Sequence, residues 1–465
     1  MKRRNIILSI VSALVVLAGT SCSGVKNLQK PELELPAHIE GQTTDSLTLA
    51  DVDWWKVYSD SALVYIISET LSHNRDLAAA GATMERLNEL YGLTASNFFP
   101  TIGANAYANR ETNKYYHEND IVDPEIGLNL TIRWEVDLWG GLRWARKKGE
   151  ADFLASVENR RALRISLIAE AATAYFNLIA LDNELSIVRR TLYTREENLK
   201  KAKLRFEGGL TPETVYRQAE VEYATTAALI PGLERRIEVQ KNAITLLMGR
   251  FPAEELKRNN LMLEEPLPET IPVGLPSTLL QRRPDIRAAE SSLRSALAAV
   301  GVAYADRFPN LRIGLTGGAE DNDFANLLRS PFSFVVGSIT GTILDFGRNK
   351  RKYRAAIAAY DQSRYKYEQT VLNAFREVDD AVVTFRNMRQ TTARRRDLLE
   401  AARKYANLAY AQYNMGVLNY IDVLDAQRRY FDAQVGVSNA VRDEYLALVQ
   451  LYKVLGGGWQ DSAGR

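Results

Sequence analysis

Two long stretches of the chain carry apolar residues at helical spacing. Residues 150–207 and 349–415 contain neither Gly nor Pro, so no residue type in them ends a helix. Helices of about 60 residues would each be about 90 Å long at 1.5 Å per residue. Their apolar residues alternate steps of four and three, which predicts coiled-coil packing. These residues are Ala174, Leu178, Leu181, Leu185, Val188 and Leu192, then Val371, Phe375, Val378, Val382 and Phe385.

Charged residues recur along both stretches, and on that ground we exclude a membrane-spanning helix. The rods are also longer than a compact globular domain needs. Coiled-coil helices packed against one another are therefore the predicted use of these two stretches.

Elsewhere the pattern alternates between apolar and polar residues, which predicts strands at about 101–110, 126–138, 310–318 and 332–345. The second run exceeds the about 5–6 residues of a typical strand and covers the about 9–11 that cross a membrane. We expect one face of it to contact lipid, with Trp134 and Trp139 in an interfacial aromatic girdle. The predicted lipid-facing residues are Ile126, Leu128, Leu130, Ile132, Trp134, Val136 and Leu138.

The fourth predicted strand is less regular than the other three. Phe332, Phe334 and Val336 lie on one phase of the alternation, whereas Ile339 and Ile343 lie on the other. A β-bulge near Gly337 would bring both sets to one face. We therefore predict a bulge at that position.

Four strands cannot close a membrane barrel. Open strand edges leave backbone groups unpaired in hydrocarbon, and the smallest membrane barrels have about 8 strands. Two copies of the chain would supply about 8 strands and three about 12, enough for an open lumen. The polar inner faces favour a water-filled interior, and hence three or more copies.

The chain also contains an internal duplication. Residues 74–100 align with 283–309 at an offset of 209, and residues 205–249 align with 412–456 at an offset of 207. Each half repeats a shorter helix, two strands and two long helices. The predicted boundaries are a signal peptide at 1–21, an N-terminal segment at 22–59, a first repeat at 60–276, a second repeat at 277–458 and a tail at 459–465. The predicted long helices are 140–207 and 213–248 in the first repeat, and 348–415 and 420–455 in the second.

The first residues have the layout of a secretory signal. Lys2, Arg3 and Arg4 precede an apolar run, and the small residues before Cys22 end it. The segment resembles a bacterial lipoprotein signal, in which Cys22 becomes the lipidated N-terminus and anchors the chain. Gly19 stands where such signals usually have Leu. The alternative is an uncleaved membrane anchor, which the length of the uncharged run allows.

Composition excludes several classes of function. The 59 Lys and Arg balance 57 Asp and Glu, for a net charge of +2, so no basic excess points to nucleic acid. With 3 His and 1 Cys, neither a four-ligand zinc site of the usual type nor an internal disulfide can form. We predict no metal site and no cofactor. No set of nucleophile and base is recognisable, so we predict that the protein is not an enzyme.

Short glycine-containing turns join each long helix to its partner, at 208–212 and at 416–419. Asp422 and Asp425 follow the second turn and share a helix face. In an oligomer they would gather near one axis, where rings of carboxylates control ion passage. The alternative is that they are acids favoured at a helix start by the helix dipole.

Six blocks of sequence, in order, are similar to the TolC-like outer-membrane efflux family, and to its NodT-type lipoprotein branch within RND efflux systems. They cover nearly all of the chain after Cys22. The blocks are WWKVYSDSALVYIISETLSHNRDL (54–77), WEVDLWGGLR (134–143), GLPSTLLQRRPDIRAAE (274–290), YEQTVLNAFREVDDA (367–381), YIDVLDAQ (420–427) and YKVLGGGW (452–459).

The resemblance implies a mainly α fold with transmembrane β-strands. Long coiled-coil helices form a periplasmic α-barrel, and four strands per protomer contribute to a 12-stranded outer-membrane barrel in a homotrimer. The expected partners are a periplasmic adaptor protein, an inner-membrane RND-type pump and outer-membrane lipid, but no nucleic acid. The chain would passively export drugs and toxic compounds delivered by the pump.

The resemblance also assigns roles near the second turn. Asp422 and Asp425 match the segment that narrows the tunnel at its periplasmic end, and Ile421 resembles a hydrophobic gate position. Tyr413 matches a tyrosine that helps hold the closed state. Leu418 stands where some relatives carry Arg, so we expect that interhelical link to be absent.

Three other functions stay open at this point. A duct of the same shape could export heavy-metal cations, or proteins by type I secretion. A periplasmic coiled-coil protein without a pore is a third alternative, although such a rod needs no lipid-facing strand.

Overall fold

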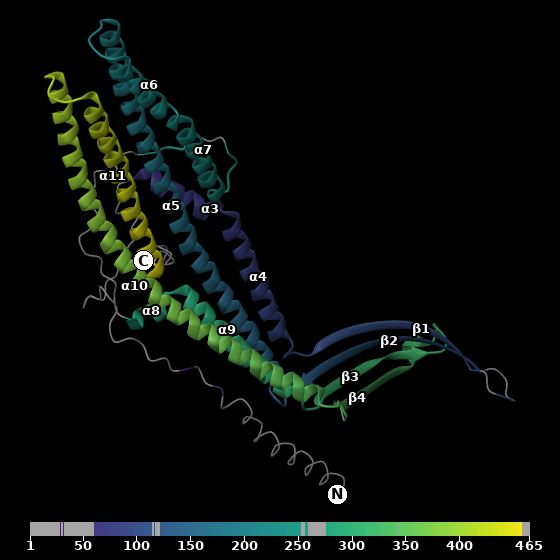
Figure 1. Ribbon diagram of the computed structural model, residues 1–465. Coiled ribbons are helices and arrows are strands. Elements are labelled where there is room, and N and C mark those ends of the chain that lie inside the picture. The colour runs from purple at the N-terminus through teal and green to yellow at the C-terminus, as the bar shows by residue number, and fades with distance from the viewer. Residues whose placement is uncertain are drawn as a thin grey trace. The chain divides into compact units, whose positions relative to one another are not determined.

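The computed structural model describes residues 60–113, 116, 121–252, 256–258, 276–342 and 344–457, together with Leu28 and Pro31. Cys22, the predicted signal peptide and the predicted tail lie outside the described residues. Figure 1 shows long helices and one sheet. The elements of the first half are α3 (Ser61–His73), α4 (Arg75–Ser96), β1 (Thr101–Asn113), β2 (Ile121–Val136), α5 (Gly141–Glu207), α6 (Glu213–Ala227) and α7 (Leu229–Leu247). Those of the second half are α8 (Pro276–Arg282), α9 (Pro284–Ala305), β3 (Asn310–Asp321), η3 (Leu327–Arg329), β4 (Pro331–Thr340), α10 (Arg348–Asn414) and α11 (Tyr420–Val454).

The two halves repeat the same order of elements. Helices α5 and α10 each have 67 residues, and their first and last residues are both offset by 207. Helices α4 and α9 each have 22 residues, and strands β1 and β3 follow them at an offset of 209. The two-residue difference between the halves therefore arises between the first strand and the long helix of each repeat.

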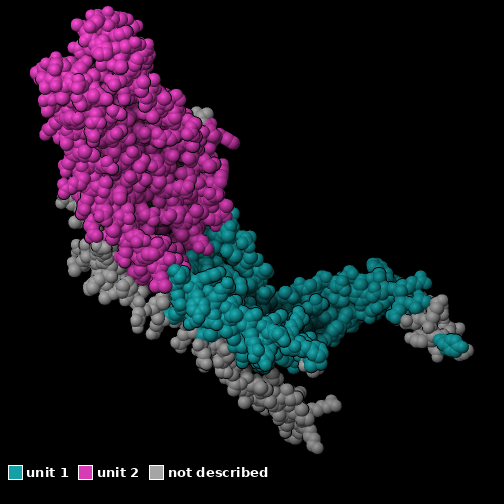
Figure 2. Space-filling model, viewed as in Figure 1, with its two compact units in different colours: residues 1–33, 82–157, 288–369 teal, residues 34–81, 158–287, 370–465 magenta. Residues whose placement is uncertain are grey.

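The described residues fall into two compact units, coloured separately in Figure 2. The first unit contains residues 82–157 and 288–369, which include the sheet. The second unit contains residues 158–287 and 370–457, together with α3. It holds the main hydrophobic core.

The sheet in the first unit is an antiparallel meander in the order β1-β2-β3-β4. Residue numbers of paired positions have a constant sum along each ladder, so no strand contains a bulge between its paired residues. The predicted bulge near Gly337 is therefore wrong, because Gly337 pairs in register with Ile313. The predicted fourth strand is also too long, since β4 ends at Thr340.

The register decides which residues share a face, because side chains directly opposite each other lie on the same side. The predicted apolar residues of β2 share their face with Ile102 of β1 and with Leu315 of β3. Leu315 pairs with Val335 of β4, so Val335 lies on the apolar face. Phe334 pairs with Thr316 and lies on the polar face instead. Strand β4 is apolar on both faces, so alternation alone could not assign its sides.

Strand β2 ends at Val136, and Leu138 lies beyond it. The residue between them, Asp137, accepts hydrogen bonds from the backbone N–H groups of Leu142 and Arg143 at 3.0 and 3.1 Å. These bonds cap the start of α5. Placing Leu138 on the lipid-facing strand was therefore wrong, because Asp137 has already turned the chain toward the helix.

The second unit is built on the coiled-coil stripes. Leu178 and Val188 of α5, and Val378 of α10, are almost completely buried in its core. One 18-residue window of α5 is apolar enough to cross a membrane by length and composition, but 67% of it is buried inside the protein. Burial thus identifies this segment as a core helix, whereas scattered charges alone were not sufficient to exclude a span.

Pro231 interrupts the helical pattern predicted at 213–248 and is expected to bend or break it, and the structure has two helices there. Helix α6 ends at Ala227, and α7 starts at Leu229. Pro231 has no backbone N–H, and its ring clashes with the carbonyl four residues earlier in a continuous helix. That carbonyl belongs to Ala227, so the break coincides with the end of α6.

Candidate functional site at the helix tips and the Arg283 junction

The first helical hairpin consists of α5 with α6 and α7, and the second consists of α10 with α11. Both hairpins turn at their tips through the same backbone motif. At the second tip, the N–H of Val417 donates to Gln412 O at 2.9 Å, and the N–H of Gly416 donates to Tyr413 O at 3.0 Å. Gly416 has φ +77°, a left-handed conformation that glycine adopts without steric cost. This is the Schellman motif that ends many helices.

The first tip repeats this geometry 207 residues earlier. The N–H of Leu210 donates to Arg205 O at 2.8 Å, and the N–H of Gly209 donates to Phe206 O at 2.9 Å. Gly209 has φ +70°. The two turns are therefore equivalent in backbone, and differences between the tips come from side chains.

Asp422 takes part in a capping box at the start of α11. Its carboxylate accepts a hydrogen bond from the backbone N–H of Asn419 at 3.2 Å, and the Asn419 side chain caps the helix in return. Asp425 pairs with Arg429 at 2.8 Å. Both acids thus have local partners within the protomer and are half-buried. Ile421, next to them, is 54% exposed.

Tyr413 links the two hairpins through a residue that the sequence did not suggest. The Arg205 guanidinium of α5 donates to the Tyr413 hydroxyl at 3.0 Å and lies 5.3 Å from the centre of its ring. Tyr413 also packs on Tyr420, with ring centres 5.4 Å apart. Leu418 packs against a small cluster centred on Ala409 and Ala426. Leu418 thus makes an apolar packing contact at the position where some relatives carry Arg.

A second link between the hairpins lies further from the tips. Glu222 of α6 pairs with the buried Arg195 of α5 at 2.9 Å and approaches Arg428 of α11 at 3.8 Å. Arg195 also donates to the carbonyl of Glu222 and to the Thr226 hydroxyl. Burial lowers the pKa of Arg195, although Glu222 partly opposes the effect. Burial also raises the pKa of the nearby Tyr420 to about 12.

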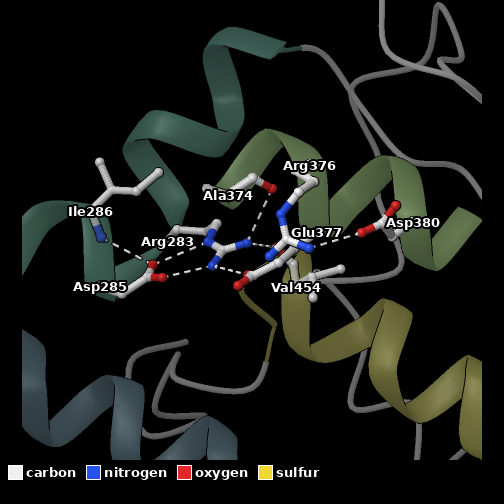
Figure 3. Close-up of polar contacts among 8 residues, drawn as sticks. All are labelled: Arg283, Asp285, Ile286, Ala374, Arg376, Glu377, Asp380 and Val454. Atoms are coloured by element: carbon white, nitrogen blue, oxygen red, sulfur yellow. Dashed lines mark hydrogen bonds and ion pairs between the residues drawn. The ribbon is translucent and has the colours of Figure 1, made fainter. Parts of the chain in front are cut away.

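The Arg283 junction lies at the other end of the second hairpin (Figure 3). The Arg283 side chain is 8% exposed, and its guanidinium lies between Asp285 at 2.6 Å and Glu377 at 2.7 Å. It also donates to the backbone carbonyls of Val454 at 3.1 Å and Ala374 at 3.4 Å. Burial lowers the pKa of Arg283, but the hydrogen bonds to Asp285 and Glu377 outweigh this effect and raise it. One side chain thus joins the start of α9, the interior of α10 and the end of α11.

Helix α9 begins at Pro284, and proline is favoured at the first position of a helix. The sequence pattern predicted no role for Arg283, because partners that are far apart in sequence leave no local pattern. The available signal was an arginine directly before a helix-starting Pro-Asp pair. In the first half the equivalent position is Asn74, whose side-chain amide donates to Leu247 O at 3.0 Å.

The apolar face of the sheet is exposed to its surroundings. Leu128 and Leu130 of β2 are 47% and 59% exposed, and Val335 of β4 is 72% exposed. The indole N–H of Trp134 donates to Phe98 O at 3.0 Å, and that of Trp139 donates to Pro309 O at 2.7 Å. Both tryptophans thus have an apolar ring and a satisfied polar end, as residues at a membrane interface do. Among the described residues, no group of three or more His, Cys, Asp or Glu side chains could hold a metal ion.

Comparison with known proteins assigns the family. The profile of the outer membrane efflux protein family matches residues 66–250 and 275–457. The chain belongs to this family. It is 30% identical to the solvent efflux pump outer membrane protein SrpC of Pseudomonas putida, over 97% of this chain and 98% of the relative. The toluene efflux pump outer membrane protein TtgI of the same species matches equally well.

Solved structures of channels have the same fold. The outer-membrane channel OprN superposes with a TM-score of 0.87 at 28% identity, over 94% of this chain and 99% of that one. The open state of the MtrE outer membrane channel of Neisseria gonorrhoeae gives a TM-score of 0.82 at 28% identity, over 94% and 99%. The predicted family, fold class, efflux function and outer-membrane localisation are thereby confirmed.

Proposed function

We propose that the protein is the outer-membrane duct of an efflux pump and works as a homotrimer. One observation carries the proposal: a four-stranded sheet has an exposed apolar face and leaves the outer edges of β1 and β4 unpaired among the described residues. Unpaired edges are not stable in hydrocarbon. Three copies pair these edges and close a barrel of about 12 strands around a lumen.

The long helices extend this barrel into the periplasm. Helices α5 and α10, each of 67 residues, are about 100 Å long at 1.5 Å per residue. Their tips receive a periplasmic adaptor and, through it, an inner-membrane RND-type pump. The relatives named for solvents, toluene and antibiotics support small apolar and amphiphilic molecules as cargo.

A lipid at Cys22 would add a second attachment to the outer membrane. Two separate attachments hold a protein at a membrane more firmly than either alone, so the lipid assists the barrel rather than replacing it. The proposed modification is tested by mass spectrometry of the mature N-terminus, with Cys22→Ala as the control.

The proposed gate is the second tip, where Asp422 and Asp425 of three protomers face one axis. Ile421 supplies an exposed apolar ring, and the Tyr413–Arg205 bond holds the second hairpin against the first. The acids need not lose their capping partners, because a carboxylate has two oxygens and about four acceptor sites.

The duct is tested by purification and by conductance in planar bilayers. We expect a trimer in detergent and discrete conductance steps. A species that stays monomeric, or a trimer that never conducts, would contradict the proposal.

The gate is tested by Asp422→Ser combined with Asp425→Ser. We expect higher conductance and greater entry of large antibiotics into cells. The matched control is Val215→Ser with Gln218→Ser, at the equivalent positions of the first tip. Unchanged conductance in a correctly assembled Asp variant removes the gate assignment.

A further inference from the structure

A cavity of about 850 Å³ lies within the second unit, between α5, α10 and α11. Its size is within the range of about 300–1,000 Å³ that is common for small-molecule sites. Asp422 and Asp425 do not line it, although Gln427 of the same helix does. The proposed gate residues therefore do not account for the cavity.

The lining of this cavity is strongly basic. Four cations contribute to it, namely Arg190, Arg195, Lys201 and Arg396, against the single carboxylate of Glu197. Glu197 already pairs with Lys200 at 3.0 Å, outside the lining.

Three of the four cations lack a carboxylate partner. Arg195 is neutralised by Glu222. Lys201 reaches only the Tyr410 hydroxyl, at 3.4 Å. Within the described part of the chain, the guanidinium groups of Arg190 and Arg396 make no ion pair, and both residues are exposed to solvent. Like charges left around one cavity repel each other, and an anion placed between them removes that repulsion.

The remaining walls suit a flat apolar body rather than a bare inorganic ion. Tyr193, Tyr430 and Phe431 line the cavity, and the Arg195 guanidinium lies 5.9 Å from the centre of the Phe431 ring. Side-chain amides such as that of Asn407 add hydrogen-bonding groups. Aromatic walls with a few convergent charges are typical of sites for amphiphilic ligands.

We propose that this cavity binds anionic, ring-bearing small molecules such as aromatic sulfonates and carboxylates. The acidic group lies between Arg190 and Arg396, and the ring packs on the tyrosines and Phe431. Because Arg190 belongs to the first repeat and Arg396 to the second, the bound anion links the two hairpins. Binding therefore stabilises their packing within each protomer, an effect beyond the proposed duct function.

The test uses naphthalene-2-sulfonate, titrated by calorimetry into the purified full-length protein in a neutral detergent, with protein-free micelles as the blank. We expect saturable binding that weakens with added salt, and a rise in the thermal unfolding temperature. Two probes of similar shape serve as controls: cationic 2-naphthylmethylammonium and neutral 2-naphthalenemethanol. Both should bind at least about tenfold more weakly.

Variants assign the binding to this cavity. Arg190→Gln with Arg396→Gln should weaken sulfonate binding about tenfold or more, whereas Arg190→Lys with Arg396→Lys should retain most of it. The matched control is Arg394→Gln with Lys404→Gln, which removes two exposed cations of α10 that already pair with Asp397 and Glu400. This control should leave binding unchanged.

Two outcomes overturn the proposal: no saturable sulfonate binding to the folded protein, or binding that the two glutamine substitutions leave intact. Equal binding of the cationic probe would also overturn it. Calorimetry reports on the cavity whether or not the protein conducts, so failure here is distinguishable from failure of the duct.

Discussion

The two hairpins of this chain share a backbone turn but differ in the helix that follows it. After the first tip, α6 begins at Glu213 without a side-chain cap, and the return path breaks between α6 and α7. After the second tip, α11 begins with a capping box and continues unbroken for 35 residues. The break lies beside Pro231, whose equivalent in α11 is Ser438. Ser438 allows the helix to continue, and its hydroxyl accepts a hydrogen bond from the Asn183 side chain at 2.8 Å.

The comparison shows which features a duplicated chain retains. A left-handed glycine stays at each tip because few other residues adopt that conformation without strain. Side chains that act through charge have diverged, since Asp422 and Asp425 correspond to Val215 and Gln218. The continuous, capped α11 is therefore the better element to carry a gate as a rigid rod.

The largest predicted difference concerns the Arg283 junction and its counterpart. Arg283→Ala leaves two carboxylates and two carbonyls without their shared donor, and should lower the free energy of unfolding by about 3–5 kcal/mol. Asn74→Ala removes a helix cap and one hydrogen bond, and should cost about 1–2 kcal/mol. Chemical denaturation in detergent, followed by circular dichroism, measures both.

Arg376→Ala is the control for the Arg283 variant. Its exposed ion pair with Asp380 should contribute less than about 1 kcal/mol. If Arg283→Ala and Asn74→Ala lowered the free energy of unfolding equally, the larger set of contacts around Arg283 would not stabilise the protein more than the contacts of Asn74, contrary to the prediction.

The next difference concerns the glycines that follow the ends of α7 and α11, the last helix of each hairpin. Gly249 and Gly456 both have positive φ, at +68° and +76°. A Cβ on Gly249 would lie 2.2 Å from the carbonyl oxygen of His73, whereas one on Gly456 would lie 3.3 Å from the backbone of Arg282. Gly249→Ala should therefore destabilise by about 3 kcal/mol, and Gly456→Ala by about 1–2 kcal/mol. Thermal unfolding gives the order, and the reverse order would contradict the backbone clash at His73.

The smallest difference concerns the two caps. Asn419→Ala removes the capping box and should cost about 1 kcal/mol. Pro212→Ala, at the equivalent position, removes no side-chain cap and should cost clearly less. Hydrogen exchange should become faster in the first turn of α11 in the Asn419 variant alone. Faster exchange at both tips would mean that the cap does not distinguish them.

Local periodicity predicted the buried or apolar face correctly wherever the two faces of an element differ in polarity. The four-three spacing in α5 and α10 identified residues that are buried in the core, such as Leu178 and Val378. Alternation in β2 identified one apolar face from Ile126 to Val136. Local pattern did not place β4, because Phe334 and Val335 are both apolar and only the hydrogen-bond register with β3 separates their faces.

Contacts between distant residues could not be read from any pattern. Glu377 lies 94 residues beyond Arg283, and Val454 lies 171 beyond it. Arg205 and Tyr413 are 208 apart. An isolated charged residue in a sequence fits a solvated surface as well as a buried junction, so partner and burial had to come from the fold.

The sequence by itself determined the elements, the duplication and the need for partner copies, because these follow from repeat spacing and from backbone hydrogen bonding in a membrane. Only the tertiary structure decided the sides of β4, the buried Arg283 and the basic cavity beside α5. Each of these depends on free energies shared between residues that are far apart in the chain, and local spacing carries no information about such pairs.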